Sequence, residues 1–130
     1  MLKRLLTVLF GTAVVATPVA AGQWLEGGLY VTAREEGGFV PLKILKLDDH
    51  GVHVRVYSNV YPAPPEAIDE STLYMAGADR RDGEPLGMGH LPISTASFSG
   101  WEAQFVQPSS VAAEEREGYE LWLEAEGGYF

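Results

Sequence analysis

The sequence contains no cysteine among its 130 residues. No disulfide can therefore cross-link the fold, and no thiolate can act as a nucleophile or bind a metal ion. The same absence excludes the lipid anchor of bacterial lipoproteins, which is attached to a cysteine. A small exported protein without disulfides is more typical of a bacterial periplasm than of animal secretion.

Basic residues are scarce as well, because nine Lys and Arg face eighteen Asp and Glu, which gives a formal net charge of −9. Such a chain repels phosphate backbones and anionic lipids, so we expect neither a nucleic-acid partner nor a membrane partner once any signal is removed. Six acidic residues gather near the end of the sequence: Glu114, Glu115, Glu117, Glu120, Glu124 and Glu126. This segment is either a solvated helix face or a docking surface for a basic partner.

The first 21 residues have the layout of a secretory signal peptide. A basic start at 1–4 precedes an apolar run over 5–16, and small residues at 19–21 follow a proline. The apolar run has about 12 residues, whereas a membrane-spanning helix needs about 20. We expect cleavage after Ala21, one globular domain over 22–130, and localisation in the periplasm or outside the cell; an uncleaved anchor is the alternative.

Three segments of the mature chain alternate apolar and polar residues with a period of two, which is typical of half-buried strands. They are 29–34, 40–44 and 52–57, and they predict an antiparallel meander over 28–61. Gly37 and Gly38 suit a tight turn with positive φ. The second turn should close on Gly51 in the left-handed conformation.

The pattern becomes less regular after the meander. We expect the prolines of 61–65 to keep that stretch out of the sheet. Further expectations are a short strand at 72–75, a loop over 77–89, a helical turn at 94–100 capped by Ser94, a strand at 102–107, and a helix opened at 108–110 with Ser110 as its cap. Tyr119, Trp122 and Leu123 should form the buried side of that helix.

These elements predict a mainly β (α+β) fold. We expect either a bent antiparallel sheet or an open small barrel of about five strands, with a C-terminal helix packed on it.

Four residues within one turn and strand could bind a metal ion: Asp48, Asp49, His50 and His53. Their spacing does not place them on one face, as a helical His-Glu-x-x-His zinc site does, so we expect a solvated turn and neither metal nor cofactor. His90 should lie in a structural turn. No phosphate-binding loop and no Gly-x-Ser-x-Gly elbow is present, so nothing favours an enzyme, although a hydrolase with a site near His90 stays as a hypothesis.

The polar face of the third predicted strand is rich in residue types that are common in recognition surfaces. It would carry, about 7 Å apart from one to the next, His53, Arg55, Tyr57, Asn59 and Tyr61. Either the C-terminal helix covers this face, or the face is an open ligand surface. In the second case, the binding residues would be Arg55, Tyr57 and Tyr61, with His90 beside them.

Two resemblances follow from these motifs. The run over 30–57 resembles the opening meander of SH3-like or Tudor-like small barrels, which implies binding of peptides or modified side chains. The stretch Gly51-Val52-His53-Val54-Arg55-Val56-Tyr57-Ser58-Asn59, followed by Gly89-His90-Leu91-Pro92, Phe98 and Trp101, resembles a family of small uncharacterised bacterial exported proteins. That second resemblance implies no activity.

The sequence thus favours a non-enzymatic, exported protein-binding module of unknown ligand. An immunity-like inhibitor of a basic toxin is the alternative, because the acidic charge suits such a partner.

The first testable prediction concerns export. The protein recovered from a bacterial periplasm should have the intact mass of a chain that starts at Gly22. Recovery of the full-length mass in the membrane fraction would instead favour the uncleaved anchor.

Overall fold

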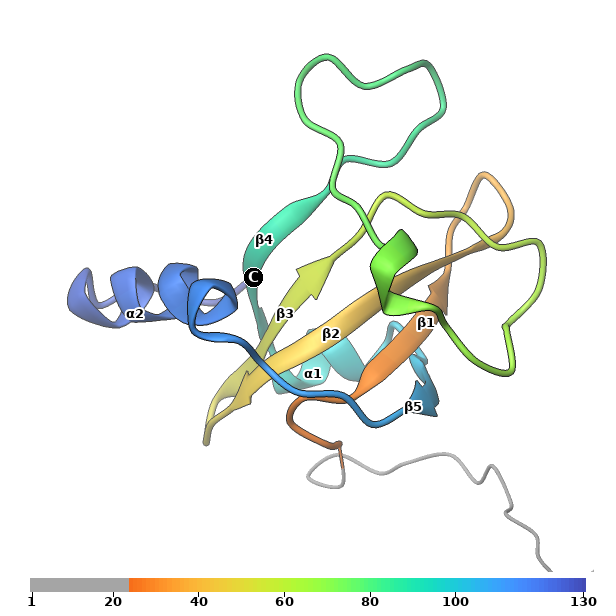
Figure 1. Ribbon diagram of the computed structural model, residues 1–130. Helices are drawn as coiled ribbons and strands as arrows, with labels where there is room; N and C mark the ends of the chain where they lie inside the picture. The colour runs from red at the N-terminus through yellow and green to blue at the C-terminus, as the bar shows by residue number, and fades with distance from the viewer. Residues whose placement is uncertain (1–23) are drawn as a thin grey trace, which may run out of the picture.

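The computed structural model describes residues 24–130, so the predicted signal peptide and its cleavage position lie outside the described residues. Five strands form one open antiparallel sheet with the order β4-β3-β2-β1-β5 (Figure 1). The elements are β1 Leu29–Ala33, β2 Phe39–Leu47, β3 Gly51–Val56, η1 Glu70–Thr72, β4 Met88–Ser94, α1 Thr95–Ser99, β5 Gln104–Gln107, η2 Ala113–Arg116 and α2 Glu117–Glu124. The predicted mainly β fold with about five strands and a C-terminal helix is confirmed. Within 24–130, no helix is both long enough and apolar enough to cross a membrane.

The predicted meander of the first three strands is confirmed, and its two turns use different chemistry. Gly37 and Gly38 have φ of 104° and 81°, which only glycine adopts easily. The second turn is held by the Asp48 carboxylate, which accepts hydrogen bonds from the backbone N–H groups of His50 and Gly51. Gly51 does not have positive φ, so the prediction of a left-handed residue there was wrong. Its lack of a side chain instead makes room for the Tyr129 ring and the Ile93 carbonyl.

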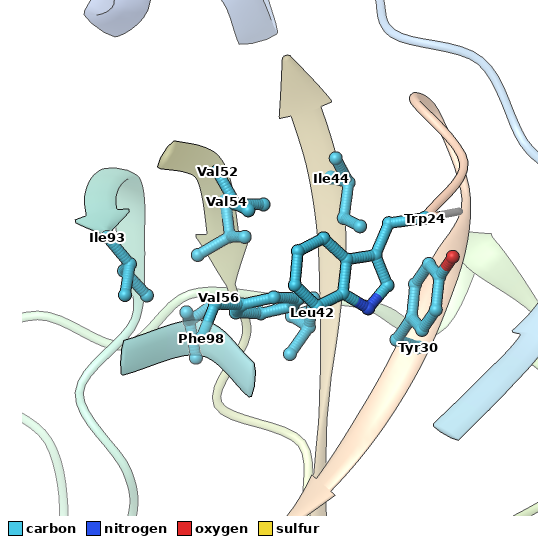
Figure 2. Packing of buried hydrophobic residues seen from close by; sticks show 9 residues of the cluster. All are labelled: Trp24, Tyr30, Leu42, Ile44, Val52, Val54, Val56, Ile93 and Phe98. Atoms are coloured by element: carbon cyan, nitrogen blue, oxygen red, sulfur yellow. The ribbon is translucent and has the colours of Figure 1, made fainter. Parts of the chain in front are cut away.

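One face of the sheet carries the main apolar core (Figure 2). Phe98 of α1 and Trp24, which precedes β1, pack edge to face with ring centroids 4.9 Å apart. They cover side chains from four strands: Tyr30, Leu42, Ile44, Val52, Val54, Val56 and Ile93. The predicted capping of α1 is confirmed, since Ser94 Oγ accepts a hydrogen bond from the Ser97 N–H at 3.2 Å.

The opposite face is covered as well, by the segment that contains η1 and by the chain that follows β5 (Figure 1). Leu29 and Val31 pack there against Tyr57 and Ile68. Both faces of the central strands are therefore buried. The alternation of apolar and polar residues in the sequence does not separate a buried face from a solvent-exposed one.

Other local predictions were wrong for identifiable reasons. Residues 72–75 form no strand; η1 begins after Asp69, whose carboxylate caps it by accepting from the Ser71 N–H, and it ends at Thr72. His90 lies in β4 and not in a turn, at a point where the pairing of β4 with β3 is interrupted by a shift in register. Pro92 is tolerated in β4 because it lies on the outer strand of the sheet, where its carbonyl accepts from the Phe130 N–H.

The C-terminal helix begins later than predicted. Its first turn is η2, and the Ala112 N–H is capped by the Glu115 carboxylate at 2.8 Å. Ser110 is therefore not the cap; its carbonyl accepts from Lys43 Nζ. Leu123 was placed on the buried side and is half exposed.

The second prediction tests the central strand. Val54 is fully buried, so Val54→Ala should lower the free energy of unfolding by about 1–3 kcal/mol, through lost burial and the cavity left behind. Val60→Ala is the matched control, because Val60 is exposed, and should change it by less than about 0.5 kcal/mol. Similar losses in the two denaturant titrations would contradict the register of β3.

Candidate functional site

His53, in the middle of β3, has no exposed surface, and both of its ring nitrogens have partners. Nε2 lies 2.8 Å from Asp48 Oδ2, and Nδ1 lies 2.9 Å from His90 Nε2. The side chain points away from the valine face, as the alternation predicts. The face on which it lies is nevertheless closed to solvent at this point.

Four aromatic rings enclose the His53 imidazole. His90 of β4 stacks on it at a centroid distance of 5.1 Å and an interplanar angle of 9°. Tyr119 and Trp122 of α2 meet it nearly at right angles, at 4.7 and 4.5 Å, and Tyr129 lies at 5.5 Å. The prediction that Trp122 contacts the sheet is thus confirmed, and its contact is with a histidine.

The Asp48 carboxylate collects four hydrogen bonds and ties the cluster to the β2–β3 turn. Oδ1 accepts the two backbone bonds of the turn, and Oδ2 accepts from His53 Nε2 and from the Tyr129 hydroxyl. Burial alone would raise the pKa of Asp48, but these bonds outweigh it and hold the pKa well below its usual range. Burial and the bond to Asp48 raise the pKa of the Tyr129 hydroxyl.

His90 is the outer member of the Asp48–His53–His90 chain. Burial, and then the charge of His53, lower the pKa of His90 from 6.5 to about 4. The unfolded chain therefore binds a proton more readily than the folded one, and the contribution of this group to stability is complete above pH 6.5 and is lost as the pH falls through about 4. Gly118 packs so closely that a Cβ there would lie 2.6 Å from His90 Cβ.

A second polar cluster lies on the same face of the sheet. Lys43 is 4% exposed, and its ammonium lies 3.1 Å from Glu115 Oε2 and 2.8 Å from the Ser110 carbonyl. Burial would raise the pKa of Glu115, but the Ala112 N–H, Lys43 and Arg55 lower it on balance. This ion pair fixes η2, and so the start of α2, over β2.

The four predicted binding residues are distributed over this covered face. Arg55 is opposite Lys43 in the sheet register and is partly buried, with Nε lacking a hydrogen-bond partner. Tyr57 is 5% exposed, and burial, followed by the charge of Glu115, raises its pKa to about 12. Tyr61 pairs with Phe39, and its buried hydroxyl also lacks a partner. His90 lies apart from these three residues, in contact with His53.

This face is therefore covered, but the C-terminal helix covers only its His53 end. Tyr57 is buried instead against Ile68 and the strand β1 residues Leu29 and Val31.

Two residues of the cluster carry a signal in the sequence, and the others do not. Asp48 and His53 were considered as metal ligands, and the structure shows them bonded to each other, with Asp49 and His50 exposed. Among residues 24–130, no group of three or more His, Cys, Asp or Glu side chains is placed to hold a metal ion. No pattern in the sequence pointed to Tyr129, because no local period relates it to a turn 81 residues away.

No protein-family model, no curated protein and no solved structure matches this chain. The two resemblances named above therefore stay predictions, and the function has to be argued from the residues themselves.

The third prediction concerns the Lys43–Glu115 pair. Glu115→Gln should lower the free energy of unfolding at pH 7 by about 3 kcal/mol, since it leaves the buried Lys43 ammonium with the Ser110 carbonyl and the more distant Glu70 carboxylate, at 3.8 Å, to balance its charge. Because the folded-state pKa of Glu115 is lowered, this contribution is present above the ordinary pKa of 4.5 and is lost as the pH falls below it. Denaturant titrations should therefore show the variant and the wild type converging in acid. Glu114→Gln, at the exposed neighbouring position, should change little; an equal loss there would contradict the role of the pair.

Proposed function

We propose that this chain is an exported, non-enzymatic protein-binding module, and that α2 carries its contact surface. The observation that carries the proposal is the exposure of Leu121 and Leu123, which are 65% and 50% exposed although the helix is fixed through Tyr119 and Trp122. Large apolar side chains that project from an ordered helix suit the centre of a protein interface.

The charges around the two leucines favour a basic partner. Glu117, Glu120, Glu124 and Glu126 are exposed on and after α2. Residues two apart do not share a helix face, so the two leucines project on either side of Trp122, and each has charges of one sign nearby. Such charges steer an oppositely charged protein toward its docking position. The chain as a whole has a formal charge of −9, so the long-range field has the same sign as the local one.

This proposal moves the binding surface away from Arg55, Tyr57 and Tyr61. Those residues lie under the chain that covers the sheet, whereas α2 lies beside β3 and β4 at the border of the molecule (Figure 1). An immunity-like inhibitor of a basic toxin would use the same α2 surface, so it is a special case of the proposal in which the partner is a toxin.

A hydrolase is the second candidate, favoured by the Asp48–His53–His90 chain. A half-buried carboxylate that orients one imidazole, which in turn bonds a second, is a way to position a general base. His90 would be the base, since its pKa of about 4 keeps it neutral at pH 7. Hydrolysis of simple esters that disappears in His90→Gln and persists in His50→Gln would replace the binding proposal with this one.

The fourth prediction tests the α2 surface with a lysine- and leucine-rich helical peptide as the probe. The peptide should bind the mature protein at low salt, and its NMR shift changes should centre on Leu121 and Leu123. Replacing both with serine should weaken binding about tenfold or more, since apolar residues at an interface centre carry much of the binding energy.

The matched control replaces two leucines exposed elsewhere, Leu25 and Leu86, with serine. This variant should bind like the wild type, and a glutamate- and leucine-rich peptide should not bind. Equal binding of the acidic peptide, or equal losses in the two double variants, would overturn the proposal.

A further inference from the structure

The contact between His53 and His90 has room for only one proton. Because Asp48 is ionised, His53 Nε2 donates to it, and a single hydrogen lies between His53 Nδ1 and His90 Nε2, which are 2.9 Å apart. That hydrogen can belong to either ring. If both rings are fully protonated, two N–H groups face each other, the hydrogen bond is lost, and two positive charges are stacked at 5.1 Å.

The helix rests on this pair of rings. Tyr119 and Trp122 contact His53, and both also meet His90, at 6.3 and 6.2 Å. Gly118 lies against the His90 side chain. The helix itself has no buried residue, so few other contacts hold it on the sheet.

We propose that the His53–His90 pair is an acid-opened latch: it holds α2 and the segment up to Tyr129 on β3 and β4 while the two rings share one proton across their contact, and it releases them when a further proton, taken up by His90, leaves both rings fully protonated. The pKa of about 4 for His90 places the opening in mild acid. Release would expose Tyr119 and Trp122 while the main core on the other face of the sheet stays packed.

The other groups that face the pair do not open it. Asp48 is the carboxylate in contact, and its lowered pKa keeps it ionised as His90 titrates. Tyr129 stays neutral in acid, because its pKa is raised, and Tyr119 meets His53 edge to face. Two cationic side chains also lie near His53: Lys46, its cross-strand neighbour, and Arg55, two residues along β3. Lys46 is paired with Glu26, and neither cation is among the groups that lower the pKa of His90.

The latch stands on this geometry, and only its effect on partner binding rests on the proposed function. A partner docked on Leu121 and Leu123 would be held at neutral pH and would lose its ordered helix in acid. Acid can also weaken peptide binding without opening the latch, so a variant that keeps the acidic surface of α2 and removes only the histidine is needed to separate the two effects.

His90→Gln is that variant. The glutamine amide can donate through its N–H to a neutral His53 Nδ1, or accept through its oxygen from a protonated one, and it never carries a charge, so α2 should stay docked. The readout is the indole N–H resonance of Trp122, which donates to the Gly128 carbonyl at 3.0 Å, with the indoles of Trp24 and Trp101 as internal references. Amide exchange over 117–124 relative to β2 is the second readout.

In the wild type, the Trp122 indole should shift together with the His90 ring as the pH falls from 7 to 3.5, and relative exchange over 117–124 should rise about tenfold or more. His90→Gln should abolish both changes, and His50→Gln, at an exposed histidine, should not. A His90 titration without any change at Trp122, unchanged acid opening in His90→Gln, or simultaneous loss of the sheet would each overturn the latch.

The same samples tested with the lysine- and leucine-rich peptide separate the two proposals. If wild-type binding falls more steeply in acid than that of His90→Gln, the latch regulates the α2 surface. If the peptide does not bind at any pH while the Trp122 and exchange changes occur, the latch stands and the proposed function fails.

Discussion

The hydrogen bond between Asp48 and His53 is the constraint on which this side of the molecule depends. An imidazole without exposed surface costs free energy unless its nitrogens are paired, and Asp48 satisfies one of them while closing the β2–β3 turn. The other nitrogen then needs a partner on β4, which His90 provides. The Tyr129 hydroxyl donates to the same carboxylate. The Asp48 side chain therefore positions three groups: the β2–β3 turn, the buried His53 ring and the segment that follows α2.

This arrangement also explains why α2 differs from an ordinary amphipathic helix. Its inner contacts are edges of aromatic rings around His53 and an ion pair at its start, and no apolar stripe is buried beneath it. Such contacts are directional, so they define where the helix lies without covering its apolar side chains. Leu121 and Leu123 consequently stay exposed to solvent, and the proposed binding surface rests on that exposure.

The parts of the fold that were predictable are those specified within a few residues. Gly37-Gly38 defines a turn, Ser94 caps α1, and the alternation of apolar and polar residues identifies β2 and β3 as strands, although not the shift in their register between Ile44 and Lys46. The rest depends on groups that meet only after folding. Ser110 was chosen as a helix cap on local grounds, whereas Lys43, 67 residues earlier, binds its carbonyl and Glu115 provides the capping group instead. Asp48 and His53 carried a visible chemical signal in the sequence, but their role became clear only with Tyr129 and His90 beside them.

The two faces of the sheet therefore differ: one contributes stability through apolar burial, and the other contains the contacts that are sensitive to pH. The face under Phe98 and Trp24 is built from apolar side chains and Tyr30, whose pKa is raised, mainly by burial, so acid changes no charge within that cluster. The opposite face contains the His53–His90 contact and the buried Lys43–Glu115 pair. Because these ionisable contacts attach α2 and η2, α2 is the element whose attachment should respond to acid before the sheet does. The helix is attached through an ionisable pair, whereas the sheet is stabilised by an apolar core. The helix can therefore become exposed to solvent without unfolding of the domain.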